Sequence, residues 1–154
     1  MKKIYKILII SLVLSLLLIF PPQSMLYSKD YQYQNSGMAS FISYWIGTPY
    51  RYGGTTKKGI DCSAFSRVFY MEFFGKTIPR TAREQFRALE KITKECLQAG
   101  DLIFFRSKGS PSGWHVGIYL WGNNFIHAAN RKMGVVISNL ERPEYSKKIL
   151  GYRR

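Results

Sequence analysis

Two cysteines and two histidines are the only thiol and imidazole groups in the 154-residue chain, so its candidate nucleophilic sites can be compared directly. A cysteine attacks a carbonyl carbon when a neighbouring histidine removes its proton and a third polar group orients that histidine. Cys62 follows Asp61, a residue type that favours helix N-caps, and precedes apolar residues at helical spacing. Backbone N–H groups and the dipole at a helix start favour the thiolate. Cys62 is therefore the candidate nucleophile.

Cys96 lacks such surroundings. It lies at the end of a helix or in a turn, where a small buried apolar residue is the simplest interpretation. A disulfide between Cys62 and Cys96 is an alternative, because exported proteins often pair an even number of cysteines. A zinc site made from the two cysteines and two histidines is less well supported, because no short ligand spacing is present. We expect no metal.

The two histidines fall in consecutive runs that favour β-strands, residues 114–120 and residues 125–129. If residues 122–124 formed a three-residue hairpin loop, His127 would pair with Tyr119. His115 and His127 would then share a face but stand roughly 13 Å apart. A wider loop, a bulge or strong coiling is needed if His115 is a base and His127 orients it.

The surrounding pattern predicts helices first and strands second. Apolar spacing indicates helices over residues 38–45, from Asp61 to Gly75, and from Thr81 to about Leu89. Five short β-favouring runs follow, at residues 102–105, 115–120, 124–129, 135–138 and 149–152. This order predicts an α+β domain in which N-terminal helices pack on a C-terminal antiparallel sheet of about five strands.

Five motifs, in this order, resemble those of the NlpC-type cell-wall peptidases, a bacterial branch of the papain-like cysteine peptidases. They are the glycine-bearing loop at residues 47–54, the nucleophile turn at 59–63, the start of a helix at 78–85, a strand at 98–105, and the two histidine runs. The resemblance covers residues 38–154. It implies a papain-like core in which Cys62 is the nucleophile, His115 the general base and His127 the orienting residue, with no cofactor.

The same resemblance implies substrate or oxyanion contacts for Tyr52, Asp61 and Ser63. Tyr52 could instead pack on the core as a turn aromatic, and N-capping alone would account for Asp61. The chain departs from the family pattern at Ala64, where glycine is usual after the Cys-Ser pair. This departure removes no catalytic residue.

The activity that the resemblance implies is hydrolysis of the γ-D-glutamyl–diamino acid amide in peptidoglycan stem peptides, by a monomer. An amidase or acyltransferase on the same core is the enzymatic alternative. A catalytically silent module that binds the cell wall is the alternative from another functional class.

The N-terminal residues have the profile of an export signal. Three lysines precede an apolar run at residues 7–20, which is shorter than the roughly 20 residues of a membrane-spanning helix. We therefore predict a signal peptide at 1–28, a linker at 29–37, and the peptidase domain at 38–154. The protein is expected in the periplasm, in the cell envelope or outside the cell, and an uncleaved membrane anchor is the alternative.

A formal net charge of +14 is compatible with nucleic-acid binding, but export and the scattered positions of the basic residues argue against it. We expect weak electrostatic association with anionic wall polymers or membrane surfaces, and no nucleic-acid partner.

Overall fold

The computed structural model describes residues 36–154 and divides the chain into two units, residues 1–43 and residues 44–154. Residues 36–45 form a helix, which begins two residues before the predicted boundary at 38. The predicted signal peptide and residues 29–35 of the predicted linker lie outside the described residues. No helix among residues 36–154 has both the length and the apolar character needed to cross a membrane.

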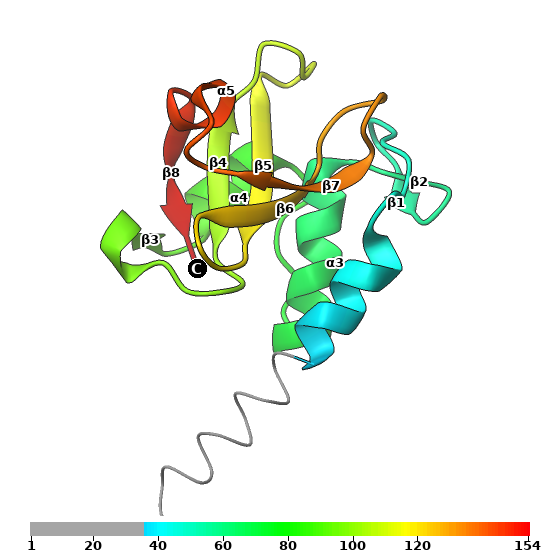
Figure 1. The fold of residues 1–154 in the computed structure, drawn as a ribbon, viewed down its shortest axis with the longest axis horizontal. Coiled ribbons are helices and arrows are strands. Elements are labelled where there is room, and N and C mark those ends of the chain that lie inside the picture. The colour runs from blue at the N-terminus through cyan, green and yellow to red at the C-terminus, as the bar shows by residue number, and fades with distance from the viewer. Residues whose placement is uncertain (1–35) are drawn as a thin grey trace, which may run out of the picture. The chain divides into compact units, whose positions relative to one another are not determined.

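Six strands of the second unit form one antiparallel sheet in the spatial order β3-β8-β4-β5-β6-β7 (Figure 1). Their bounds are β3 (Lys91–Ile92), β4 (Leu102–Arg106), β5 (Trp114–Tyr119), β6 (Asn124–Ala128), β7 (Val135–Asn139) and β8 (Ile149–Arg153). Five of them coincide with the five predicted runs, so the α+β prediction is confirmed. The sixth, β3, has only two residues and was not predicted. A separate two-stranded sheet pairs β1 (Thr55–Thr56) with β2 (Gly59–Ile60).

Helix α3 (Cys62–Phe74) has the predicted bounds because its two ends are capped. The Asp61 side chain accepts the backbone N–H of Ala64 at the start. Gly75 at the end has φ 61°, a left-handed conformation that glycine adopts without strain. The helix buries Phe65 and Phe69 and packs against β5 and β6. The first residue of α3 is thereby held beside the strands that carry the two histidines.

Helix α4 (Ala82–Ala88) begins with a capping box in which Thr81 and Glu84 bond to each other's backbone N–H groups. Its fully buried Gln85 donates to the carbonyls of Ser63 and Pro79 and accepts the hydroxyl of Ser66. A buried amide with all these partners is well satisfied. Gln85 thus ties α4 to the first turn of α3. The remaining helical segments are η1 (Lys94–Cys96) and α5 (Pro143–Ser146).

The β5–β6 hairpin turns at residues 121–123, where Leu120 N–H donates to the carbonyl of Asn124 at 2.9 Å, one residue earlier than the loop at 122–124. Tyr119 pairs with Phe125 and Ile118 with Ile126, which shifts the pairing by two positions. Gly122 and Asn123 both have positive φ, 56° and 63°, and form the tight turn at its tip. The two-position shift keeps the same side chains on each face and moves His127 along β5 towards His115.

Candidate active site

The Cys62 side chain lies at the first position of α3 and is 7% exposed. Its thiol interacts with the backbone N–H of Val116, the residue that follows His115 in β5. Burial raises the pKa of this thiol to about 11, and the negative charge of Asp61 acts in the same direction. Backbone hydrogen bonds from Val116 and Ser63 oppose the rise but do not overcome it. The expectation of a thiolate was therefore wrong: desolvation outweighs the helix start, and the resting group is a neutral thiol.

His115 and His127 are in direct contact: Nε2 of His115 lies 2.6 Å from Nδ1 of His127. Both rings are buried, with exposures of 9% and 1%. A side chain on Gly117 would place its Cβ 2.5 Å from the ring of Phe125 and 3.4 Å from Cβ of His127. The absence of a Cβ at this position leaves room for the ring of Phe125, which precedes His127 by two residues in β6. The structure thus brings together the two histidines that a loop at residues 122–124 would have separated.

Burial also determines the protonation of the histidines. It lowers the pKa of His115 to about 4, and it lowers the pKa of His127 well below its ordinary value, with an added contribution from His115. Both imidazoles are neutral at pH 7. A neutral imidazole can accept a proton, so His115 is in the form that a general base requires.

Asp61 is saturated with hydrogen bonds. One carboxylate oxygen accepts from Ser63, Ala64 and Arg80, and the other accepts from Arg80 and from the backbone N–H of Gly53. Burial alone would raise the pKa of Asp61, but the bonds from Arg80, Ala64 and Ser63 hold it below its ordinary value. Asp61 therefore joins the loop at Gly53, the start of α3 and Arg80 into one buried assembly. Arg80 was not predicted from the sequence as a site residue, because it lies 19 positions from Asp61 in the chain.

Two tyrosines lie on the loop before α3, in different surroundings. Tyr52 is 54% exposed, whereas Tyr50 is partly buried. Burial raises the pKa of Tyr50 to about 12, with further contributions from Cys62, Asp61 and Tyr52. The phenol of Tyr50 is thus electrostatically coupled to the nucleophile. Of the two, Tyr52 was predicted from the sequence as a site residue and Tyr50 was not.

Cys96 lies in η1 and is exposed, and neither it nor Cys62 forms a disulfide. This exposure differs from the buried apolar position expected from the sequence. The assembled site therefore contains one cysteine, Cys62.

Comparison with known proteins agrees with this geometry. A model of the NlpC/P60 family matches residues 47–154, which include every site residue described above. The chain belongs to the NlpC/P60 family.

Individual NlpC/P60 relatives match the same region. The chain is 44% identical over 110 residues to "Murein DD-endopeptidase MepS/Murein LD-carboxypeptidase" of Escherichia coli, covering 71% of this chain and 57% of that protein. It is 40% identical over 111 residues to "Gamma-D-glutamyl-L-lysine dipeptidyl-peptidase" of Bacillus cereus, covering 71% and 33%. A crystal structure of a Bacillus cereus NlpC/P60 family protein superposes with a TM-score of 0.65 at 38% identity, covering 71% of this chain and 36% of that one. The chain thus spans between about a third and somewhat over half of the length of these relatives.

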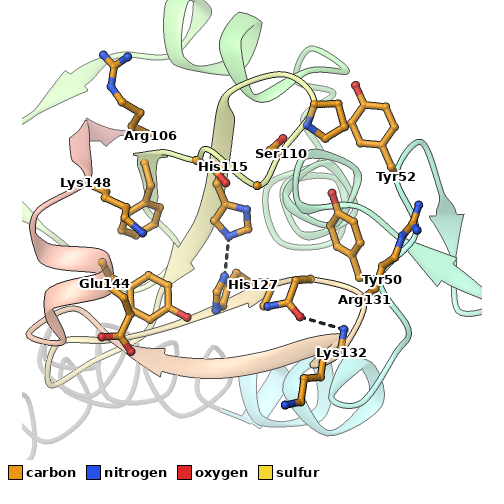
Figure 2. A pocket seen from close by; sticks show the side chains of 17 residues that line it. Tyr50, Tyr52, Arg106, Ser110, His115, His127, Arg131, Lys132, Glu144 and Lys148 are labelled. Atoms are coloured by element: carbon orange, nitrogen blue, oxygen red, sulfur yellow. Dashed lines mark hydrogen bonds between the residues drawn. The ribbon is translucent and has the colours of Figure 1, made fainter.

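In this NlpC/P60 domain a cavity of about 660 Å³ lies beside the paired histidines (Figure 2). Tyr50, Tyr52 and both histidines line it. Figure 2 shows Lys148 on one side of the histidines and Arg131 on the other. Cys62 is not among the lining residues, although its charge contributes to the raised pKa of Tyr50, which lines the cavity.

The lowered pKa of the buried histidines predicts a loss of stability in mild acid. Below about pH 6.5 the unfolded chain binds protons at these positions that the native site does not bind, so the free energy of unfolding falls as the pH drops from 6.5 towards 4. His115 alone accounts for about 3 kcal/mol over this interval. Urea unfolding at several pH values should therefore show a smaller loss for His115→Gln than for the wild type. Parallel pH dependences of the two proteins would contradict the assignment of a buried, neutral His115.

Proposed function

We propose that this chain is an exported cysteine endopeptidase that hydrolyses the amide between the γ-carboxyl of D-glutamate and the following diamino acid in peptidoglycan stem peptides. One observation carries the proposal: the thiol of Cys62 is buried at the start of α3 against the backbone N–H of Val116, the residue after His115, and His115 is hydrogen-bonded to a second histidine. The names of the Escherichia coli and Bacillus cereus relatives support an enzyme that acts on cell-wall peptides.

The site suits attack by a thiol that is deprotonated only as it reacts. His115 takes the proton of Cys62, and the sulfur forms a bond to the scissile carbonyl carbon. Collapse of the tetrahedral intermediate breaks the C–N bond, and the His115 imidazolium gives its proton to the leaving amine. Water, deprotonated by His115, then hydrolyses the thioester and regenerates the thiol. Each step uses neutral starting groups, in agreement with the raised pKa of Cys62 and the lowered pKa of His115.

The developing oxyanion would lie at the N-terminus of α3, where backbone N–H groups are available to stabilise negative charge. Tyr52 remains a proposed contact because it lines the cavity, and Tyr50 joins it because its phenol is coupled to Cys62. Asp61 and Ser63 are buried behind Arg80, whose side chain is 34% exposed. We propose that Asp61 and Ser63 contact the substrate where they adjoin the partly exposed Arg80 side chain.

The charge of the cavity supports an acidic peptide as the substrate. Four cationic side chains and one acidic side chain line it: Arg106, Arg131, Lys132, Lys148 and Glu144. Among the described residues, none of the four cations forms a salt bridge, whereas Glu144 faces Arg142 at 3.9 Å. A γ-linked D-glutamate leaves its α-carboxylate free beside the scissile amide, so such a substrate would bring an anion to this wall.

Export would bring this basic protein to its substrate in the cell envelope. The net charge of +14 would also favour association with anionic wall polymers or membrane surfaces. We propose that the enzyme acts as a monomer, because all the side chains of the proposed site come from one chain.

A second bond is a specific alternative, because the Escherichia coli relative is named a DD-endopeptidase and the Bacillus cereus relative a γ-D-glutamyl peptidase. An amidase or acyltransferase would use the same cysteine and histidines on another carbonyl. A silent wall-binding module is disfavoured, because the proposed catalytic groups are assembled. His115 and His127 lie at hydrogen-bonding distance, and Cys62 contacts β5, the strand that carries His115.

Mass spectrometry of digested cell wall tests the proposed bond. We expect incubation of intact sacculi with the enzyme to leave glycan that ends in L-Ala-D-Glu, and a soluble L-Ala-γ-D-Glu-diaminopimelate tripeptide to release diaminopimelate. The Cys62→Ala protein is the matched control and should release neither product. Cleavage at the glycan-to-L-Ala amide would make the protein an amidase, and cleavage confined to cross-links between stems would support the DD-endopeptidase alternative. Wall binding without any cleavage would support the silent module.

A further inference from the structure

We propose that Ser138 and Tyr145 are positioning residues of the catalytic site, and that they select the tautomer in which Nδ1 of His115 is free to accept the proton of Cys62. The inference rests on the proposed function for its catalytic consequence. The arrangement of the four side chains is independent of the substrate.

The hydrogen-bonded histidines continue into a longer chain of polar groups. Nε2 of His127 lies 3.0 Å from Oγ of Ser138, and Oγ of Ser138 donates to the hydroxyl of Tyr145 at 3.2 Å. The four residues come from three neighbouring strands, β5, β6 and β7, and from helix α5, which follows β7 in the chain. Ser138 is 5% exposed, and buried polar groups of this kind are normally hydrogen-bonded.

The direction of one bond determines the direction of the others. A serine hydroxyl has a single hydrogen, and Ser138 gives it to Tyr145, so Ser138 can only accept from Nε2–H of His127. A neutral imidazole has one N–H, which leaves Nδ1 of His127 as an acceptor for Nε2–H of His115. Nδ1 of His115 is then unprotonated. The donor chain therefore runs from His115 to Tyr145 and ends with the base ready to act.

Packing keeps the end of this chain in place. The ring of Tyr145 meets the ring of His127 edge to face, with centroids 5.5 Å apart, and meets Phe125 in the same way at 5.0 Å. Tyr145 belongs to the four-residue helix α5, in which no residue is fully buried. Its ring therefore gives this short helix a defined contact with His127.

Removal of Ser138 would release the constraint on the tautomer. Without an acceptor at Nε2, His127 can instead carry its proton on Nδ1 and donate to Nε2 of His115. The proton of His115 then moves to Nδ1, where it blocks abstraction from Cys62. Loss of the outer hydrogen-bond partner of a metal-bound histidine typically costs roughly 10–100-fold in activity, and we expect a similar loss here.

The test compares Ser138→Ala with Ser138→Thr, which keeps a hydroxyl, and with Tyr145→Phe. We expect Ser138→Ala to lower kcat roughly 10–100-fold with KM changed less than about threefold. We expect Ser138→Thr to restore most of that loss, and Tyr145→Phe to give an intermediate loss. Nitrogen-15 NMR of the histidines in the resting enzyme should show that the His115 proton leaves Nε2 in Ser138→Ala.

Ser66→Ala is the matched control, because Ser66 is a buried serine with two hydrogen bonds outside the histidine chain. It should lower thermal stability without altering the histidine tautomers. Unchanged tautomers in Ser138→Ala, or a kcat within about twofold of the wild type, would overturn the proposal. If the wild type hydrolyses no wall peptide, the proposed function fails, yet the NMR measurement still decides whether Ser138 sets the tautomer.

Discussion

Replacement of Cys62 by alanine is expected to abolish hydrolysis, with a fall in kcat of roughly 10⁴-fold or more, while Cys96→Ala keeps wild-type activity. Cys62 is the cysteine that touches β5 beside His115, whereas Cys96 is exposed in η1. Alanine at position 62 also leaves the Asp61 cap and the burial of α3 intact, so the variant should fold.

The two variants should be compared by release of product from a defined muropeptide, with circular dichroism to verify folding. Thiol counting and intact mass under oxidising conditions should show no Cys62–Cys96 bridge in the wild type, because Cys62 is buried whereas Cys96 is exposed. Hydrolysis at the wild-type rate by Cys62→Ala would refute the mechanism. Loss of activity in Cys96→Ala would show that the second thiol has a role which its position does not indicate.

The second large effect is a contrast between the two histidines. His115→Ala should be close to inactive, with a loss of roughly 10³-fold or more, because no other described group is placed to take the proton of Cys62. His127→Asn or His127→Gln should keep measurable activity, because an amide oxygen can accept from Nε2–H of His115 and the amide N–H₂ can donate to Ser138. Steady-state kcat and KM for the three variants measure the contrast. Equal losses in all of them would mean that His127 does more than orient His115.

Local signals in the sequence were sufficient for most of the fold. The N-cap at Asp61, the C-cap at Gly75 and the capping box at Thr81 are short-range features, and the helices begin and end at them. The five longer strands were predicted because each combines β-favouring residues with turn residues on either side. β3 was missed because a two-residue strand has no period of its own and exists only through its pairing with β8.

The candidate groups of the site could be chosen from the sequence, but their arrangement could not. The small number of thiols and imidazoles limited the choice, the place of Cys62 after an N-cap residue favoured it over Cys96, and the family resemblance implied roles for His115 and His127. Their mutual placement depends on where the hairpin turns, at Gly122 and Asn123 with positive φ, and on the close approach of the Phe125 ring to Gly117, which are properties of the folded hairpin. A sequence pattern does not set a hairpin register to within two residues.

Tertiary contacts also account for the sites that sequence reasoning missed. Arg80 bonds to Asp61, 19 positions away in the chain, and Ser138 bonds to His127, 11 positions away, so no local motif indicates either contact. The protonation of Cys62 was mispredicted for the same reason. The helix start is a local feature that favours the thiolate, but burial against β5 is a tertiary feature with the opposite and larger effect on the pKa.

The most direct test of the central claim is identification of the group bound to Cys62 during turnover. The enzyme would be mixed with muropeptides, quenched in acid within milliseconds, digested, and mapped by mass spectrometry. We predict a thioester on the peptide that contains Cys62, with an acyl group that ends in D-glutamate joined through its γ-carboxyl. The acyl group identifies the nucleophile and the scissile bond in one spectrum. An acyl group on any other residue, or one that still contains the diamino acid, would contradict this account.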